Sequence, residues 1–249
     1  MGLSKRAIGF YYRNLHPYVA TPRSARCVFC GWRGRAFHDF ATGFDHVYKR
    51  STCPDCGSQP RHRLLRLYME NLLDEEKPIK LLHFAPEPSF TEFFETYSNI
   101  EYLSVDLDET KAMRREDITD LTFADETFDM IFCSHVLEHI EDDHKAMTEL
   151  VRVLKHDGLA IIHVPIDLYR EDTYEDPSID TPEARTKAYW QYDHLRLYGR
   201  DFPKKLEKAG FDVTIDEFVY ALGERKIVTL GLEERPIYLC RPRDEAGNG

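Results

Sequence analysis

Four cysteines in the first quarter of the chain have the spacing of a metal site. They stand in two pairs, Cys27-Val-Phe-Cys30-Gly31 and Cys53-Pro-Asp-Cys56-Gly57. In a Cys-x-x-Cys knuckle two thiolates face one ion, and the glycine after the second cysteine relieves crowding where the chain turns back. Four sulfurs fill a tetrahedral zinc site and leave no open position, so we expect a structural ion rather than a catalytic one. Two disulfides are the alternative, and a cytoplasmic location makes them less favourable.

The segment around these cysteines is predicted to form a zinc ribbon over about residues 23–62. The 22 residues between the two pairs are long enough for a β-hairpin. Its small core would contain the aromatic residues Trp32, Phe37, Phe40 and Phe44. Because this core is small, the metal would supply much of the stability. The remaining cysteines, Cys133 and Cys240, lie in apparent strands and are predicted to be buried thiols.

Charge divides the chain into a basic front and an acidic body. The whole chain has 33 Lys and Arg against 44 Asp and Glu, which gives a net charge of −11. Up to Glu70 there are twelve basic and four acidic residues, so the front carries +8 and the remainder −19. The arginines around the predicted ribbon are Arg23, Arg26, Arg33, Arg35, Arg61, Arg63 and Arg66. Such a surface suits the phosphates of an anionic partner, but a role of the opposite charges in docking the two parts explains it equally well.

A second set of candidate functional residues lies where the apolar runs of the body end. The set consists of His83, Ala85 and Glu87 at the first run, Asp106 and Asp108 at the second, Ser134 and His135 at the third, and residues 165–167 at the fourth. An acid at the end of the second strand can accept hydrogen bonds from both hydroxyls of a ribose. Asp106 has this position, and Asp117 farther along could accept from the exocyclic amine of adenine. These two acids predict a nucleoside-cofactor site; a solvated or capping role is the alternative.

The elements that would carry these residues alternate between strand and helix. The predicted strands are residues 80–85, 101–107, 128–134, 159–166, 211–218 and 235–242. The predicted helices are residues 89–97, residues 142–158 ended by Gly158, and residues 201–210 ended by Gly210. This alternation predicts an α/β fold, namely a Rossmann-like, doubly wound, mostly parallel sheet with helices on both faces, preceded by the zinc-ribbon module. The strand at 235–242 is expected to be an edge strand.

The stretch "LLHFAPEPSF", residues 81–90, is predicted to run from a buried strand through a turn into a helix. Ser89-x-x-Glu92 has the spacing of a capping box at the start of that helix. Strand–turn–helix units of this kind hold cofactors in many α/β enzymes, usually on a glycine-rich turn. Here the turn has no glycine, so it is either a cofactor-binding loop built from other residue types or a turn with a structural role only.

Three longer stretches of the body resemble successive motifs of class I S-adenosylmethionine-dependent methyltransferases. They are "YLSVDLD", "DITDLTFADETFDMIFCSHVLEHI" and "AMTELVRVLKHDGLAIIHVPI". The resemblance extends from about Lys80 to Arg241, and its middle part resembles the small-molecule branch often called type 11. It implies a class I methyltransferase fold and S-adenosylmethionine as the cofactor.

The resemblance also implies roles for individual residues. Asp106 corresponds to the ribose ligand, and Asp117 with Ile118 corresponds to the adenine contacts. Ser134 and His135 correspond to positions beside the methionine part of the cofactor and the substrate.

The turn after the first strand departs from that family. The family usually has an acid followed by Gly-x-Gly-x-Gly, whereas this chain has His83, Ala85, Glu87 and Ser89 at the corresponding places. S-adenosylmethionine carries no phosphate, so the glycines serve mainly for clearance, and Ala85 is the next smallest residue. The prolines on either side of Glu87 stiffen the turn, and the Glu87 carboxylate is predicted to meet the ammonium group of the cofactor. The alternative is a loop that has lost cofactor binding.

A long acidic, tyrosine-rich segment, residues 167–202, interrupts the alternation and is predicted to form a lid or substrate wall. Its candidate substrate-binding and catalytic residues are Tyr192, Asp193, His194, Arg196 and Tyr198. Asp193 would orient His194 as a general base, and Arg196 would hold an anion. His135 is the other candidate base. A solvated surface helix is the alternative for this segment.

From the resemblance and the predicted site we expect a methyltransferase domain over residues 71–243, preceded by a basic segment with the ribbon, residues 1–70, and followed by a disordered tail, residues 244–249. The expected reaction is methyl transfer to a small molecule or to a sugar or glycan. One alternative is an RNA methyltransferase in which the basic ribbon holds RNA; the other is a non-catalytic binding protein with a degenerate methyltransferase fold. No apolar run has the length of a membrane span, and the start of the chain lacks the apolar core of a signal peptide, so a cytoplasmic location is expected. The accepting atom and the oligomeric state are not predicted.

Overall fold

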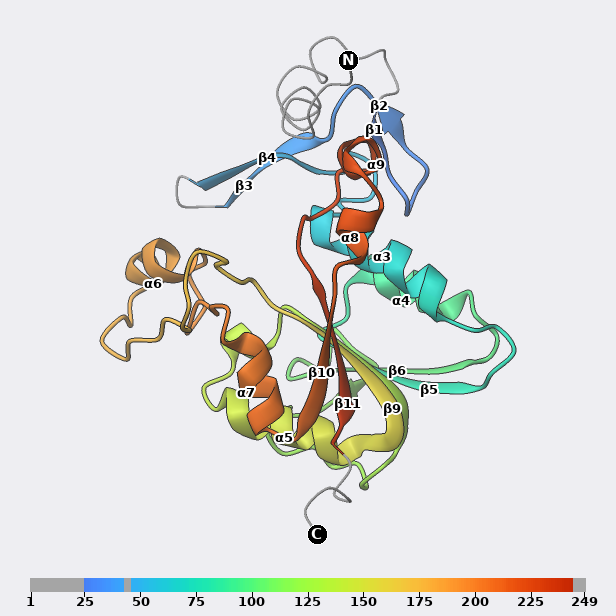
Figure 1. Ribbon diagram of the computed structural model, residues 1–249, viewed down its shortest axis with the longest axis vertical. Coiled ribbons are helices and arrows are strands. Elements are labelled where there is room, and N and C mark those ends of the chain that lie inside the picture. The colour runs from blue at the N-terminus through green and yellow to red at the C-terminus, as the bar shows by residue number, and fades with distance from the viewer. Residues whose placement is uncertain (1–24, 43–45, 244–249) are drawn as a thin grey trace. The chain divides into compact units, whose positions relative to one another are not determined.

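The computed structural model describes residues 25–42 and 46–243 (Figure 1). The predicted tail lies outside the described residues, as do residues 23–24 and 43–45 of the predicted ribbon, which include Arg23 and Phe44. The chain divides into two compact units. One comprises the described residues up to Asp74 together with Glu217–Pro236, and the other comprises Glu75–Asp216 and the described residues from Ile237 onward. Residues 217–236, which we expected in the methyltransferase domain, therefore belong to the unit with the cysteines.

In the part of the first unit that the structure describes, short antiparallel strands are combined with three helices. Its elements are β1 (Ala25–Arg26), β2 (Arg33–Gly34), β3 (His38–Thr42), β4 (His46–Thr52), α3 (Pro60–Leu72), α8 (Phe218–Ala221) and α9 (Glu224–Leu230). Strands β1 and β2 pair, and β3 pairs with β4, so the predicted hairpin between the cysteine pairs is confirmed. Phe37 is buried next to Cys27 and Cys53, with Trp32 packed against them. Phe40, by contrast, is exposed and is not part of this core.

Arg63 joins the cysteine module to the returning segment within this unit. Its guanidinium is fully buried and donates to the carbonyls of Ser51 (2.7 Å), Leu230 (2.8 Å) and Gly231 (2.7 Å). It also lies 3.9 Å above the centre of the Phe37 ring. The predicted surface role of this arginine is therefore wrong, because its donors are consumed inside the unit.

A seven-stranded sheet forms the centre of the second unit (Figure 1). Its strands are β5 (Ile79–Phe84), β6 (Ile100–Asp106), β7 (Arg114–Arg115), β8 (Phe128–Ser134), β9 (Leu154–His163), β10 (Phe211–Asp216) and β11 (Ile237–Pro242). The order is β10-β11-β9-β8-β5-β6-β7. The pairs from β9 to β7 are parallel, and β11 runs antiparallel to both of its neighbours. The sheet is therefore mostly parallel, as predicted.

The predicted edge strand lies inside this sheet. Strand β11 sits between β9 and β10, and β10 is the edge strand. Ile237, Tyr238 and Cys240 of β11 are buried accordingly. The prediction was wrong because a short apolar run does not state which strands it will pair with.

Helices cover both faces of the sheet. On one face α4 (Pro88–Glu95) packs the rings of Phe90 and Phe94 against His83 and Phe132. The opposite face is covered by α5 (Asp143–Val153) and α7 (Phe202–Lys208), whose buried residues join one core with Ile131 of β8. Two smaller helical elements, η2 (Leu137–His139) and α6 (Pro182–Tyr189), follow the strands β8 and β9.

Two predicted helix ends differ from the structure. Helix α4 begins at Pro88 with Glu87 as its N-cap, so Ser89 lies within the first turn and the predicted capping box is absent. Helix α5 ends at Val153, five residues before Gly158, because Leu154 already pairs with Phe128 in the sheet. The pairing of Leu154 in the sheet therefore ends this helix. A glycine in the local sequence cannot predict such an end, because the pairing depends on a distant strand.

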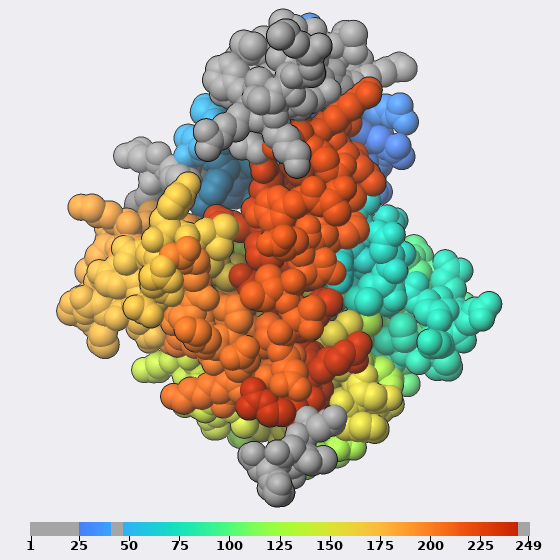
Figure 2. All heavy atoms as spheres, viewed as in Figure 1, coloured from blue at the N-terminus to red at the C-terminus, as the bar shows by residue number. Residues whose placement is uncertain are grey.

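None of the helices among the described residues combines the length and the apolar character that crossing a membrane requires. The insertion at residues 167–202 contributes a protruding surface to the second unit, seen in yellow to light orange in Figure 2.

Candidate cofactor and metal sites

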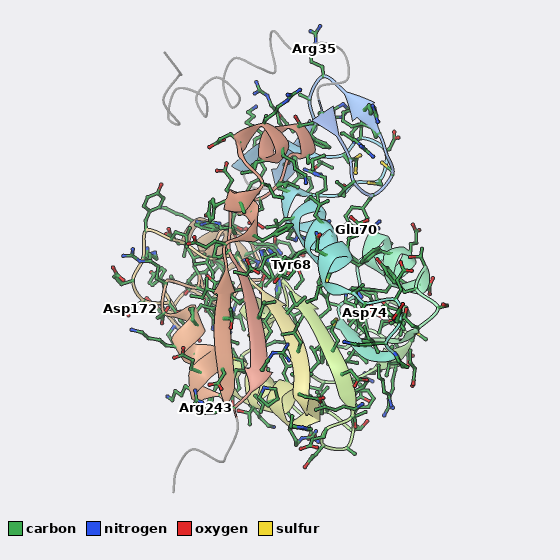
Figure 3. All side chains as sticks on the ribbon, turned by 45° about the vertical axis from the view of Figure 1, so that its right-hand side comes forward. Arg35, Tyr68, Glu70, Asp74, Asp172 and Arg243 are labelled. Atoms are coloured by element: carbon green, nitrogen blue, oxygen red, sulfur yellow. The ribbon has the colours of Figure 1, made fainter. Side chains whose placement is uncertain are left out.

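The four cysteines of the first unit lie together. The Sγ atoms of all four are within 4.8 Å of one another. Cys27 Sγ lies 3.6 Å from Cys56 Sγ, and Cys30 Sγ lies 3.6 Å from Cys53 Sγ. Sulfurs bound at about 2.3 Å to one tetrahedral zinc ion would lie about 3.8 Å apart. All four cysteines are free of disulfides, so the group fits a zinc module, and Figure 3 shows its sulfur atoms gathered beside β1 and β2.

The two knuckles repeat one backbone pattern. Gly31 and Gly57 donate to the carbonyls of Cys27 and Cys53 at 3.1 and 3.0 Å. Both glycines have left-handed backbones, with φ of 72° and 70°. The buried hydroxyl of Ser58 lies 3.2 Å from Cys27 Sγ, where it can donate to a thiolate. The sequence spacing therefore produces two equivalent turns that aim their sulfurs at one point.

In the second unit, the turn after β5 is held by a buried polar network. His83 is fully buried, with Nδ1 2.9 Å from Tyr102 Oη and Nε2 3.4 Å from the Glu87 carboxylate. Tyr102 Oη also lies 3.0 Å from Thr91 Oγ1. Ala85 has a left-handed backbone with φ of 47°, a conformation that usually favours glycine. The turn therefore adopts a glycine-like shape without glycine, and His83 positions Glu87 at its tip.

The acids after β6 lie on a chain of tight turns. Asp106 Oδ1 accepts from the Asp108 N–H at 2.8 Å, and Asp108 accepts from the Thr110 N–H at 3.0 Å. Asp117 accepts from the N–H and the hydroxyl of Thr119, both at 2.8 Å, and these bonds lower the pKa of Asp117. Asp106, the last residue of β6, and Asp117, eleven residues later, are therefore both held at fixed positions by these bonds.

A buried glutamate that sequence reasoning missed shapes the second of these turns. Glu116 accepts from the N–H and the hydroxyl of Thr122 at 2.9 and 2.6 Å, and Arg114 Nε lies 2.6 Å from it. Ile118, the predicted adenine contact, is buried close by in the sequence. No local pattern in the sequence distinguishes the buried Glu116 from the exposed Asp117 beside it.

The exit of β8 combines a partnerless hydroxyl with a second left-handed residue. Ser134 is buried, and its hydroxyl has no hydrogen-bond partner among the residues that the structure describes. His135 has φ of 57° and donates its N–H to the His163 carbonyl of β9 at 2.7 Å. Its Nδ1 lies 3.1 Å from Glu138 Oε1. The strand therefore ends in a strained turn that presents a serine and a histidine side by side.

The polar residues of the insertion differ in burial and in their partners. His194 is buried, and burial lowers its pKa; its Nδ1 lies 2.8 Å from the Tyr189 carbonyl. Asp193 Oδ2 faces His139 Nδ1 at 3.5 Å rather than His194. Tyr192 is exposed. The predicted pairing of Asp193 with His194 is thus not the pairing in the structure, where each residue faces a different partner.

Arg196 and Tyr198 are buried inside the second unit. Arg196 donates to the carbonyls of Leu137 and Glu141 at 3.1 and 2.9 Å, and it pairs with Glu175 at 2.9 Å. Tyr198 donates to the Asp143 carboxylate at 2.8 Å, and burial is the main cause of its raised pKa. These contacts consume the donors that a substrate anion would need. We therefore assign both residues to holding the insertion, and not to the predicted binding of substrate.

The comparisons with known proteins agree with this architecture. Residues 90–162 match the family described as "Methyltransferase domain". The uncharacterized protein MJ0638 of Methanocaldococcus jannaschii is 29% identical over 179 residues, which cover 64% of this chain and 72% of that protein. The uncharacterized methyltransferase YcgJ of Bacillus subtilis is 40% identical over 60 residues, 24% of this chain and 21% of that one.

The solved structure of the PH0226 protein from Pyrococcus horikoshii shares the fold. Its TM-score is 0.51 at 20% identity, and the match covers 76% of this chain and 94% of that one. With the sheet order, this likeness shows that the second unit has the expected Rossmann-like fold, and residues 90–162 within it match the methyltransferase-domain family. The expected fold and the resemblance are thereby confirmed.

Proposed function

We propose that the protein is an S-adenosylmethionine-dependent methyltransferase that acts on a small molecule or on a sugar or glycan. The observation that carries this proposal is the pair of left-handed, non-glycine residues, Ala85 and His135, at the exits of β5 and β8. These strands are parallel neighbours in the sheet, so the two strained turns share the edge where ligands of such folds bind. Strain of this kind costs stability, persists only where the surrounding structure enforces it, and clusters at functional sites.

The acids of this edge match the polar groups of the cofactor. Asp106, with Asp108 at its side, would hold the ribose, and Asp117 with Ile118 would hold the adenine. Glu87, positioned by His83, would pair with the ammonium group through a charge-assisted hydrogen bond. Residues 134–135 would lie at the methionine end.

His135 is the candidate general base of the transfer. Its contact with Glu138 (3.1 Å) orients the ring beside the buried Ser134 hydroxyl. Since the predicted partner Asp193 faces His139, the arrangement supports His135 better than His194 for this role.

Cofactor binding can be tested by calorimetry with S-adenosylhomocysteine. Glu87→Ala is expected to weaken binding by about tenfold to a hundredfold, as loss of one charge-assisted hydrogen bond implies. Glu92→Ala, on the exposed side of α4, serves as the matched control. Wild-type protein that binds no S-adenosylhomocysteine at millimolar concentration would refute the proposal and favour the non-catalytic alternative.

The acceptor class can be tested by following S-adenosylhomocysteine release with panels of phenols, amines, sugars and RNA. The acidic balance of the body, −19, favours acceptors that are not polyanions. Turnover with the small acceptors and none with RNA is the expected result.

A specific observation favours the RNA alternative enough to test it. Arg26 of β1 lies directly opposite Arg33 of β2, and both are exposed. Like charges at opposite positions destabilise a strand pair unless an anion lies between them. Arg35, the first residue after β2, points into solvent in Figure 3. A salt-dependent gel shift with RNA that Arg26→Ala and Arg33→Ala abolish would support this alternative.

For the first unit we propose a structural zinc ion on Cys27, Cys30, Cys53 and Cys56. Four thiolates leave no open coordination position, so this ion would stabilise the small module and take no part in catalysis.

A further inference from the structure

A second group of metal-ligating side chains lies in the methyltransferase unit, next to the exit of β8. One ligand atom from each of Glu138, His139 and His194 lies within 4.8 Å of the other two. Glu138 and His194 are buried, and the His139 side chain is 29% exposed. The group therefore has an interior side and a side that an ion could enter from solvent.

The hydrogen bonds of the two histidines suit them to bind an ion. A carbonyl oxygen can only accept, so the ring of His194 must donate from Nδ1 to the Tyr189 carbonyl at 2.8 Å. In the neutral ring this leaves Nε2 with its lone pair, and Nε2 is the atom that faces Glu138 Oε1 at 4.0 Å. In a metal-bound histidine one ring nitrogen usually donates a hydrogen bond away from the metal, and the other ring nitrogen binds the ion.

His139 has a carboxylate behind it. Asp193 Oδ2 lies 3.5 Å from its Nδ1, within reach of a carboxylate–histidine contact of the kind that orients metal ligands. The carboxylate also adds a negative charge close to the group. Asp193, which we expected to orient a base, is thus placed to orient a ligand.

Backbone and side-chain bonds hold the two parts of the group in register. Glu138 and His139 lie on η2, whereas His194 comes from the insertion more than fifty residues later. The Leu195 N–H donates to the Glu138 carbonyl at 2.9 Å. Arg196 then binds the carbonyl of Leu137, at the start of η2, and that of Glu141, two residues after its end. The ligands are thereby preorganised by contacts that do not use their side chains.

We propose that Glu138, His139 and His194 form a binding site for a divalent first-row transition ion, with Asp193 as a positioning residue. Two imidazoles and one carboxylate are the ligand set of open zinc and iron(II) sites, which keep positions for water or a substrate. This differs from the four-thiolate group, which is closed. The two sites therefore predict two metal ions per chain of different chemical character.

The ion would have a use if the proposed methyltransferase activity holds. An acceptor hydroxyl bound at its open position would lose its proton to the candidate base, His135, more easily, since a bound cation stabilises the oxygen anion. The acceptor oxygen then forms a bond to the methyl carbon as the carbon–sulfur bond of the cofactor breaks. The electron pair of the broken carbon–sulfur bond remains on the sulfur of S-adenosylhomocysteine. His135, in contact with Glu138, would lie between the ion and the cofactor end of β8.

The binding test uses the full chain with zinc in the four-thiolate group. Mn²⁺ is titrated and the free ion is followed by electron paramagnetic resonance. Mn²⁺ is the weakest binder of the first-row series and prefers oxygen and nitrogen ligands, so it leaves zinc on the thiolates in place. We expect one bound Mn²⁺ per chain, and Co²⁺ in its place is expected to show d–d bands without sulfur-to-cobalt charge transfer.

Variants locate the ion. Glu138→Gln and His194→Ala are expected to weaken Mn²⁺ binding by more than a hundredfold, and Asp193→Asn by about tenfold to a hundredfold. His156→Ala, which removes an exposed histidine of the same unit, is the control and is expected to bind as the wild type does. Circular dichroism identifies any variant that fails to fold, and His139→Ala, at the partly exposed position, then replaces it.

Two results would overturn the proposal. One is a wild-type protein that binds no Mn²⁺, Co²⁺ or second equivalent of Zn²⁺. The other is equal binding by wild type, His139→Ala and His194→Ala, which would identify an adventitious site elsewhere. Neither result depends on cofactor binding, so failure of the metal site and failure of the proposed methyltransferase activity are distinguishable.

Discussion

The cysteine knuckles of the first unit and the strand exits of the second solve the same backbone problem with different residues. Each requires a left-handed residue, which the knuckles provide with Gly31 and Gly57 and the strand exits with Ala85 and His135. Glycine adopts this conformation without strain, whereas other L-residues lose roughly 1–2 kcal/mol per residue. The difference teaches that the knuckles are built for stability alone, while the strand exits retain side chains at a cost in stability.

The largest expected effect concerns the metal of the first unit. Cys53→Ser removes one of the four sulfur ligands and is expected to abolish zinc binding. The effect should be large, because structural zinc contributes on the order of 10 kcal/mol to the folding of small modules. Zinc content measured by mass spectrometry should fall, and hydrogen exchange should rise in residues 25–52. Cys240→Ala, which removes a buried thiol of the other unit, should retain the metal; full zinc occupancy in Cys53→Ser would contradict the assignment.

The next effect separates two arginines of α3. Arg63→Ala leaves the carbonyls of Ser51, Leu230 and Gly231 without their buried donor, so we expect a loss of about 3–5 kcal/mol in the free energy of unfolding. Arg66, one turn later, makes a partly exposed pair with Glu70, and Arg66→Ala should cost below about 1 kcal/mol. Urea denaturation measures both, and equal costs would show that Arg63 is not the clamp described above.

A smaller effect distinguishes two left-handed glycines. At Gly231 an added Cβ would lie 2.5 Å from the Phe37 ring, whereas at Gly31 nothing lies within 4 Å. Gly31→Ala should therefore cost only the conformational term of roughly 1–2 kcal/mol, and Gly231→Ala about 1–3 kcal/mol more. Thermal unfolding of the zinc-loaded variants compares them, and a larger cost at Gly31 would reverse the order.

The smallest effect concerns the cofactor edge. The N–H and hydroxyl of Thr119 lower the pKa of Asp117, so the carboxylate contributes stability above its ordinary pKa of about 3.8. That contribution is lost as pH falls through the lowered folded-state pKa. Thr119→Val removes the hydroxyl bond and should raise the pKa of Asp117, as an NMR titration of the side-chain carboxyl would show. An unchanged pKa would assign the shift to the backbone N–H alone.

Sequence periodicity predicted the parts of the fold that local chemistry determines. The run at 128–134 coincides with β8, and the cysteine spacing predicted the four-sulfur group. It could not predict that β11 pairs on both sides, or that residues 217–236 return to the first unit. Both depend on contacts between segments distant in the sequence.

The site followed the same division. The positions of Asp106, Asp117 and Ser134 after their strands came from the sequence. The sequence did not predict the buried hydrogen bonds of Arg196 or the proximity of Glu138 to His194. These contacts join the insertion to a distant segment, so they leave no local pattern in the sequence.

The return of residues 217–236 has a consequence for synthesis on the ribosome. The first unit, although it begins the chain, lacks α8 and α9 until residue 230 has been made, and the second unit lacks β11 until residue 242 has been made. Neither unit can be completed while most of the chain emerges, so a chain that stops near residue 216 leaves both unfinished. Residues 217–242 thus set the moment at which both units can be completed.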